Sequence, residues 1–279
     1  MTDSSLLAAP TPAPELRCPE CQARWTLLAP DQSTHYACPE CQNYFKLAGA
    51  TPTVLGRFTR GADFVRQALP LGATATLPDG RRYQVVGYSA RAEAKSLDYR
   101  WGEYQLLSGA DYYAQLAVYQ GHWTFIRPDE RPHKLIRPNS RDAAVEADER
   151  TYELYNKYSP RIHHAAGEFD WNIRDDESLT VQEFIAPPFM LTREQGKGQA
   201  PEWYLAEHIE PEQVAEAFGV PRLNLPDRLG VGAIQPAPGE SSWHALLYFS
   251  FGVALLAVLL ALGLGQLRPT QSLLQQTYT

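Results

Sequence analysis

The segment YRWGEYQLLSGADYYAQLAVYQGHWTFI, from Tyr99 to Ile126, carries the clearest structural signal in this chain. It contains three runs rich in aromatic and apolar residues, Tyr99 to Leu107, Tyr112 to Tyr119 and His122 to Ile126. Apolar residues that alternate with polar ones are typical of strands with one buried face. Gln120-Gly121 is a turn signal before the last run. The segment therefore predicts three consecutive strands of a β-meander.

The same signal continues on both sides of this segment. Ala73 to Leu77 and Arg82 to Tyr88 predict two earlier strands, joined by the turn Pro78-Asp79-Gly80. Residues 128–150 are charged and rich in proline, which predicts a surface connection that ends in a short helix near 143–150. Pro211 to Phe218 predicts a closing helix. Further strands are expected at Ile162 to Ala166, Glu168 to Ile173, Leu179 to Ile185 and Trp203 to Ile209.

All four cysteines lie before this β-rich region, in two Cys-Pro-Glu-Cys repeats. Cys18 and Cys21 form the first pair, Cys38 and Cys41 form the second, and sixteen residues separate the pairs. This spacing is typical of a zinc ribbon, in which four thiolates hold one ion tetrahedrally. Because four cysteines leave no open coordination position, the spacing predicts a structural Zn²⁺.

Other interpretations of the cysteines remain. Two disulfides are disfavoured, because no export signal precedes the cysteines. A thioredoxin-like redox motif needs a single pair beside a βαβ pattern, which is not found. Iron in a rubredoxin-like site stays open, since a sulfur tetrahedron suits either metal.

The overall charge argues against one class of partner. The 279 residues carry 25 Lys and Arg against 32 Asp and Glu, a formal charge of −7. An acidic surface repels phosphate, so we expect no nucleic-acid partner. Hydrophobic residues make up 44% of the chain, which is enough for a packed core.

A second strong signal lies near the end of the sequence. Ala245 to Gly265 is a run of 21 residues without charge. A helix of that length spans about 31 Å, which matches a bilayer core of about 30 Å. The run therefore predicts a transmembrane helix. Its stripe Ala257, Ala261 and Gly265 fits either ordinary apolar filler, the preferred interpretation, or a face for weak homo-oligomerisation. Thiolate zinc chemistry favours an N-terminal part that faces the cytoplasm.

Together these signals predict a mostly β chain that contains a small four-cysteine zinc ribbon, then a β-barrel or sandwich-like domain with short helices, then one transmembrane α-helix. The expected boundaries are a disordered leader at 1–16, the ribbon at 17–48, the β-rich domain at 60–219, a Pro/Gly linker at 220–242, the transmembrane helix at 243–267 and a short tail at 268–279.

Five short phrases resemble a known bacterial family, the domain of unknown function 4178. They are Trp101 to Tyr104, Gly121 to Trp123, Gly167 to Trp171, Ala186 to Pro188 and Glu202 to Tyr204, and the likeness covers roughly residues 68–218. A preceding zinc knuckle and a following transmembrane helix are similar to the arrangement in some members. The resemblance implies a bacterial protein whose gene neighbours include polyamine-synthesis-like enzymes and membrane-stress proteins. It implies no activity.

The sequence contains no recognised catalytic motif. Gly-rich phosphate loops, Gly-x-Ser-x-Gly and a spare cysteine are all missing. The pair His163-His164 is a weak metal candidate, because adjacent strand residues face opposite ways. Carboxylates beside tryptophans are the best candidates for partner contact, namely Trp101, Glu103, Glu168 and Asp170. On alternating strands, Trp101 and Glu103 would share a face, while Glu168 and Asp170 would face outward.

Two functions fit these observations. The first is a non-enzymatic adaptor that is tethered to a bacterial inner membrane and binds a protein partner at the cytoplasmic face, in a membrane-stress or polyamine-linked system. The second is a polyamine-handling or hydrolytic enzyme with an acidic, aromatic-lined site. A pocket lined by these carboxylates and tryptophans would favour the second function, whereas a flat apolar patch would favour the first.

Overall fold

The computed structural model describes residues 14–49, 51–59, 65–138, 140–237 and 253–254. The chain divides into two compact units, Met1–Gln235 and Pro236–Thr279. The first unit contains almost all the described residues. Its strands are β1 (Glu15–Arg17), β2 (Arg24–Thr26), β3 (His35–Ala37), β4 (Asn43–Ala48), β5 (Thr51–Arg57), β6 (Thr74–Thr76), β7 (Arg82–Glu93), β8 (Ser96–Ser108), β9 (Tyr112–Tyr119), β10 (His122–Pro128), β11 (Lys134–Ile136), β12 (Ala144–Ala147), β13 (Arg150–Tyr158), β14 (Pro160–Phe169), β15 (Thr180–Ala186), β16 (Phe189–Gln195) and β17 (Glu202–Ile209). Its helices are η1 (Ile173–Ser178), α1 (Pro211–Phe218) and η2 (Arg222–Asn224).

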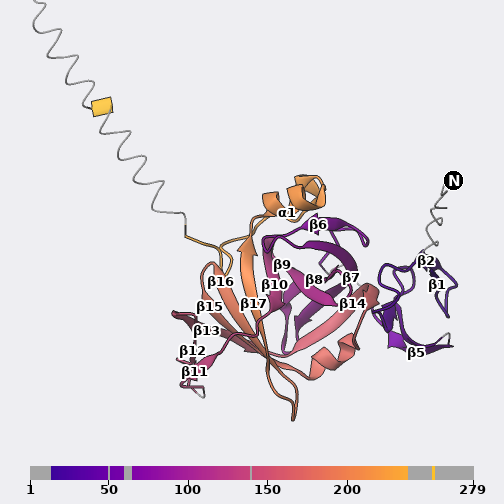
Figure 1. Cartoon of the computed structure of the whole chain (residues 1–279), viewed down its shortest axis with the longest axis horizontal. Coiled ribbons are helices and arrows are strands. Elements are labelled where there is room, and N and C mark those ends of the chain that lie inside the picture. Colours follow the sequence, from indigo (N-terminus) through magenta and orange to yellow (C-terminus); the bar gives the residue numbers. More distant parts are fainter. Residues whose placement is uncertain (1–13, 50, 60–64, 139, 238–252, 255–279) are drawn as a thin grey trace, which may run out of the picture. The chain divides into compact units, whose positions relative to one another are not determined.

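The described fold is mostly β, as the sequence predicts. One large antiparallel sheet has the strand order β11-β12-β13-β15-β16-β17-β10-β9-β8-β7-β14-β3-β4-β5, with β6 paired to β7. The sheet curves (Figure 1), but its ladder of strands does not close into a barrel among the described residues. A separate hairpin, β1 with β2, completes the N-terminal part.

The two faces of the central strands have different roles, because successive strand residues point to opposite sides. On β8, Tyr104 and Leu106 are fully buried in the main hydrophobic core, whereas Trp101, Glu103 and Gln105 lie on the other face. The expected pairing of Trp101 and Glu103 on one face is thus confirmed. Strands β9 and β10 repeat the division, so that one face of the sheet carries the core and the other lines a cavity.

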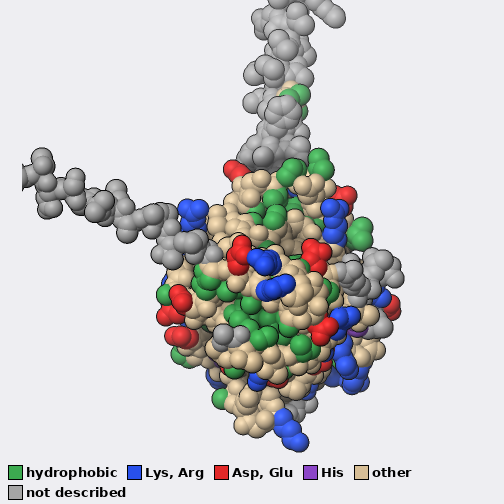
Figure 2. Space-filling view, turned by 90° about the vertical axis from the view of Figure 1, so that its right-hand side faces the viewer, with side chains coloured by type: hydrophobic (Ala, Val, Ile, Leu, Met, Phe, Trp, Pro, Cys, Tyr) green, Lys and Arg blue, Asp and Glu red, His purple; other side chains and the backbone are tan. Residues whose placement is uncertain are grey.

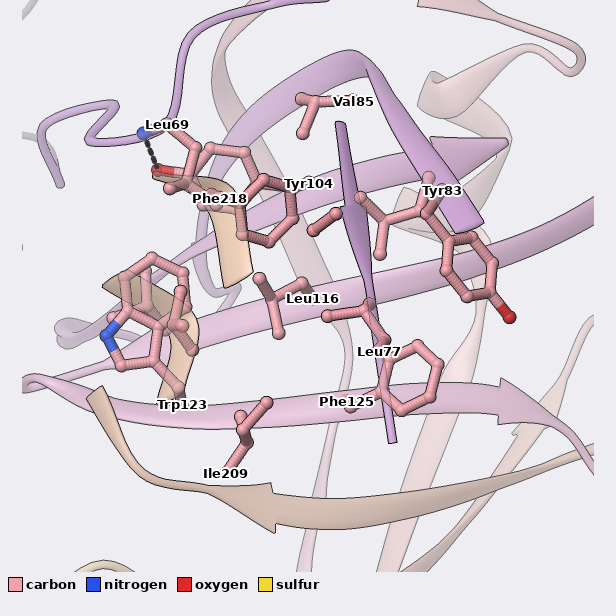
Figure 3. Close-up of a cluster of buried hydrophobic side chains, with 14 of the residues drawn as sticks. Leu69, Leu77, Tyr83, Val85, Tyr104, Leu116, Trp123, Phe125, Ile209 and Phe218 are labelled. Atoms are coloured by element: carbon pink, nitrogen blue, oxygen red, sulfur yellow. Dashed lines mark hydrogen bonds between the residues drawn. The ribbon is translucent and has the colours of Figure 1, made fainter. Parts of the chain in front are cut away.

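The main core lies between this sheet and α1 (Figure 3). Trp123 and Tyr104 are fully buried, and their rings stack at 5.8 Å between centroids. Burial of one such side chain stabilises the fold by about 1.5–3 kcal/mol. The hydroxyl of Tyr104 accepts hydrogen bonds from the backbone N–H groups of Ala68 (2.8 Å) and Leu69 (3.3 Å), which fixes the segment before β6 over the core.

Helix α1 has the bounds that the sequence predicts. Pro211 occupies its first turn, and Glu210 with Gln213 forms a capping box before it. Gly219 ends the helix at a positive φ of 63°, a conformation that glycine adopts without strain. Val214 and Phe218, one turn apart, are buried against the sheet.

The central meander agrees with the predicted strands, while the region after it differs in several places, and β11, β13 and β16 lie where the sequence predicts no strand. The helix expected near 143–150 is wrong, because these residues form β12 and the start of β13. Val145 pairs with Tyr152, and both are buried, so packing overrides the helical preference of the alanines. The two strands expected at 162–166 and 168–173 are one continuous strand, β14, followed by η1.

The cysteine-containing region is joined to the large sheet instead of forming a separate module. Strand β3 pairs with β14, with Tyr36 opposite Glu168. The side chain of Glu168 is 1% exposed, and its two oxygens accept hydrogen bonds from the N–H groups of Leu28 (2.6 Å) and Ala29 (3.0 Å). The expected outward orientation of Glu168 is therefore wrong, because the cysteine-containing region covers that face of β14.

The segment expected as a linker begins inside the compact unit. Leu225 and Ile234 are each 4% exposed, and the backbone N–H of Leu229 donates to the carbonyl of Gln120 at 2.9 Å. Gly121 permits this close approach, since an added Cβ would lie 2.2 Å from the carbonyl oxygen of Asp227. The packed chain therefore continues to Gln235.

The remaining sequence expectations lie outside the described residues. They are the leader up to residue 13, nearly all of the transmembrane helix at 243–267, and the tail at 268–279. Within the described part of the chain, no helix has the length and apolar character needed to cross a bilayer.

Candidate functional site: an acidic cavity and a four-cysteine cluster

The four cysteines converge as their spacing predicts. The sulfurs of Cys18 and Cys41 lie 3.6 Å apart, as do those of Cys21 and Cys38, and all four lie within 4.8 Å of one another. A tetrahedron with metal–sulfur bonds of about 2.3 Å has sulfur–sulfur edges of about 3.8 Å. The cluster therefore has the donor atoms and the dimensions for one metal ion, while the geometry does not identify the ion.

The two halves of the cluster have matching backbone turns. The N–H of Gln22 donates to the carbonyl of Cys18 (3.2 Å), and that of Gln42 to the carbonyl of Cys38 (2.9 Å). Both glutamines have a positive φ, 66° and 65°, which tightens each turn so that its two sulfurs face the same point. In the thiol form, the N–H of Ala23 lowers the pKa of Cys21 to about 7, whereas burial raises the pKa values of Cys38 and Cys41.

A cavity with two lobes lies on the face of the sheet opposite the main core. The larger lobe measures about 530 Å³ and the smaller about 230 Å³. Gln115, Ile126 and Glu194 line both lobes, so the lobes adjoin. The cavity's charged lining is strongly acidic: it contains the guanidinium of Arg91 and the carboxyl groups of Glu93, Glu103, Asp170, Asp175, Asp176, Glu183, Glu194 and Glu202.

Arg91 already has its partners in this cavity. Its Nη2 lies 2.8 Å from Glu103 and its Nη1 lies 3.0 Å from Asp176, while its Nε donates to Ser89 at 2.9 Å. The indoles of Trp101 and Trp171 donate to the same two carboxylates, at 3.3 Å to Glu103 and 2.9 Å to Asp176. All three nitrogens of this guanidinium are therefore engaged by Ser89, Glu103 and Asp176.

Two carboxyl groups beyond this ion pair, those of Glu183 and Glu194, have raised pKa values. Burial raises the pKa of Glu183 to about 7. Burial, followed by the nearby charges of Glu103 and Asp176, raises the pKa of Glu194 to about 8. Tyr158 donates a hydrogen bond to Glu183 at 3.0 Å, whereas no described residue donates one to Glu194. Such perturbed carboxyl groups in a cavity are characteristic of functional sites.

Aromatic side chains surround the acidic groups of the smaller lobe. Trp101 packs edge-on against Tyr158 at 5.5 Å between ring centroids, and Tyr99 stacks on Tyr119 at 6.5 Å. In the larger lobe, Asp170 Oδ1 and the hydroxyl of Tyr113 are buried without a hydrogen-bond partner among the described residues. A buried polar atom without a partner costs about 1–3 kcal/mol, so these two atoms call for a polar partner in the lobe, either water or a ligand.

The four residues that the sequence singles out for partner contact lie in different places in the structure. Trp101 and Glu103 adjoin in the smaller lobe, and Asp170 lines the larger lobe. Glu168 lines neither lobe, because it holds the turn at Leu28 and Ala29. A role of these four residues in partner contact stays a prediction.

The sequence analysis did not single out several charged residues of the cavity, among them Arg91, Asp176, Glu183 and Glu194. A lone arginine between Ala90 and Ala92 in an apolar strand was a usable signal, since a buried guanidinium needs carboxylate partners. No local pattern marks Glu183 or Glu194, because their neighbours in the cavity come from distant strands.

These features define a mostly β protein with a four-cysteine cluster and an acidic, aromatic-lined cavity. The sequence profile of DUF4178, described as a domain of unknown function, matches residues 71–211. The chain therefore belongs to this family, as the resemblance implies. The match does not include the cysteine cluster or the predicted transmembrane segment. Neither the curated proteins nor the solved structures contain a match to the chain.

The raised pKa values predict how stability depends on pH. Glu183 and Glu194 hold their protons up to about pH 7 and 8 in the folded chain, but only to about pH 4.3 when unfolded. Between these limits the folded state binds more protons, so the free energy of unfolding falls as the pH rises. We expect Glu194→Gln, which mimics the protonated acid, to reduce this fall in urea titrations between about pH 5 and 8. Glu153→Gln, on the exposed side of β13, should leave the pH dependence of the free energy of unfolding unchanged. If the unmodified chain and both variants show the same pH dependence, the burial of Glu194 is contradicted.

Proposed function

We propose that the chain binds an organic cation with several amino groups, of the polyamine class, in the acidic cavity. The observation that carries this proposal is the excess of acidic groups: among the described residues, eight carboxyl groups line the two lobes, and the one guanidinium there already pairs with Glu103 and Asp176. Asp175 and Glu202 are exposed, but the other six carboxyl groups are at least partly withdrawn from water. A carboxylate withdrawn from water is stable only when it is protonated or paired. A ligand with ammonium groups would supply the missing pairs.

The aromatic lining supports a cation that also has apolar parts. Tryptophan and tyrosine rings attract cations through their faces, and they pack well against methylene groups. Trp101, Tyr158, Tyr99 and Tyr119 supply such rings in the smaller lobe. A ligand that alternates ammonium and methylene groups fits both the carboxylates and the rings. We propose binding without a chemical step, so the ligand should be recovered unchanged.

Calorimetric titration of the full chain in detergent tests this proposal. With spermidine as the probe, we expect saturable binding that releases protons at pH 8, because the incoming ammonium groups lower the pKa of Glu194 from about 8. The variant Glu183→Gln/Glu194→Gln should bind at least about tenfold more weakly, since each change removes a charge-assisted contact. Glu153→Gln is the matched control. The proposal fails if spermidine gives no saturable heat, or if the control loses as much affinity as the double variant.

We propose Zn²⁺ as the ion of the four-cysteine cluster, in a structural role. The support is the set of four thiolate donors with tetrahedral dimensions. Elemental analysis should find about one zinc per chain, and Cys38→Ser should lower this content because it removes one of four ligands. If the chain instead contains iron and has the absorbance of an iron–thiolate site, the zinc proposal is contradicted and the cluster is a rubredoxin-like iron site.

The second candidate function is the adaptor at the cytoplasmic face of a bacterial inner membrane. One observation favours it: β5 is an end strand of the sheet, and its Val54 and Leu55 are 46% and 38% exposed. An extended peptide of a protein partner can pair with such an edge. The distribution of charge agrees with a protein and not a nucleic-acid partner, because acidic and basic side chains are interspersed on this end of the molecule (Figure 2).

Cell fractionation tests both the anchor and the adaptor. The full chain should stay in the membrane pellet after alkaline washing, because a 21-residue uncharged helix is long enough to span the bilayer. A chain that ends at residue 242 should become soluble with unchanged far-UV circular dichroism. A protein that copurifies with the full chain, but not with its Val54→Lys variant, would support the adaptor. Recovery of the full chain in the soluble fraction would contradict the anchor.

A further inference from the structure

The four-cysteine cluster is connected to the acidic cavity by a short series of hydrogen bonds. Cys38 directly follows β3, and β3 pairs with the end of β14, with Ala37 opposite Gly167. The N–H of Thr34 donates to the carbonyl of Phe169 at 2.9 Å. The strand that precedes the second cysteine pair thus lies against the segment that leads into η1.

Tyr44 makes the decisive contact in this series. It lies on β4, three residues after Cys41, and its side chain is fully buried. Its hydroxyl donates to Asn172 Oδ1 at 3.0 Å and accepts from the N–H of Ile173 at 3.1 Å. Asn172 is the N-cap residue of η1 and Ile173 is its first residue. Tyr44 therefore fixes the point at which η1 begins.

Helix η1 in turn supplies a wall of the larger lobe. Its Asp176 lies 3.0 Å from Arg91 and accepts from the indole of Trp171 at 2.9 Å. Displacement of η1 would leave Arg91 with Glu103 as its one remaining carboxylate partner, and it would open the cavity on the side of the larger lobe. The position of η1 therefore sets both the shape and the charge of the lobe.

We infer that metal occupancy of the four-cysteine cluster controls the order of η1, and through it the affinity of the larger lobe for its cationic ligand. Metal binding supplies much of the folding free energy of small thiolate modules. Loss of the metal loosens β3 and β4, so Tyr44 no longer holds Asn172 and Ile173, and η1 opens as a local unit. Because the ligand is the organic cation proposed above, the effect on affinity rests on that proposal, whereas the effect on η1 does not.

Hydrogen exchange and spermidine titration of the full chain in detergent test this inference together. After removal of the metal with EDTA, we expect amides of residues 173–178 to exchange faster and spermidine to bind more weakly. Each effect should be about tenfold, the size expected for the loss of one or two buried hydrogen bonds. Restoring Zn²⁺ should reverse both effects.

Two tyrosine variants separate this coupling from general destabilisation. Tyr44→Phe removes the contacts to η1 but no metal ligand, so it should keep its metal and still show fast exchange at Ile173 and weaker spermidine binding. Tyr36→Phe is the matched control, because the hydroxyl of Tyr36 is equally buried but donates to the carbonyl of Ser33, within the cysteine-containing region, at 2.7 Å.

The outcomes distinguish the two proposals. The coupling is overturned if Tyr44→Phe and Tyr36→Phe show the same exchange rates and the same spermidine affinity. It is also overturned if hydrogen exchange at residues 173–178 is the same with and without the metal. If the metal-loaded chain does not bind spermidine but hydrogen exchange at η1 still depends on the metal, the proposed ligand is overturned. The coupling between the metal and η1 is then supported.

Discussion

The buried ion pair of Arg91 with Glu103 and Asp176 is the constraint on which the cavity depends. It joins the consecutive strands β7 and β8 to η1, which lies much later in the chain. Removal of one partner from a buried ion pair commonly costs about 3–5 kcal/mol, because a charge remains without compensation. Together with the hydrogen bond to Ser89, these contacts engage all three nitrogens of the guanidinium. The cavity consequently contains carboxyl groups that have no cationic partner among the described residues. Their burial without such a partner raises the pKa values of Glu183 and Glu194.

The second constraint is the junction between the cysteine-containing region and the sheet. Glu168 is a buried carboxylate whose charge is met by two backbone N–H groups, at 2.6 and 3.0 Å. Burial raises its pKa, and these hydrogen bonds from Leu28 and Ala29 oppose the rise. Together with the pairing of β3 and β14, this contact makes the cysteine-containing region part of the same sheet as the cavity. A metal site that is physically continuous with a ligand site can influence it, which a module on a flexible linker could not do.

The sequence predicts those parts of the fold that depend on local patterns. Period-two alternation predicts the meander from β6 to β10, Pro211 predicts the start of α1, and the two Cys-Pro-Glu-Cys repeats predict the cluster. The same rules fail where the decisive neighbours are distant in sequence. Val145 forms a strand because it pairs with Tyr152, and Glu168 is buried because residues 140 positions earlier cover it. The acidic cavity belongs to this second group, since Glu103, Asp176 and Glu194 come from three separate elements.

The central claim is that the surplus carboxyl groups of the cavity exist to pair with a cation. Carbon-detected NMR of the side-chain carboxyl groups of Glu183 and Glu194, titrated with and without spermidine, measures this directly. In the free protein the two groups should titrate with pKa values of about 7 and about 8. With saturating spermidine, both pKa values should fall by about one unit or more toward the ordinary value near 4.3. Identical titration curves in the presence and absence of the polyamine would contradict the claim.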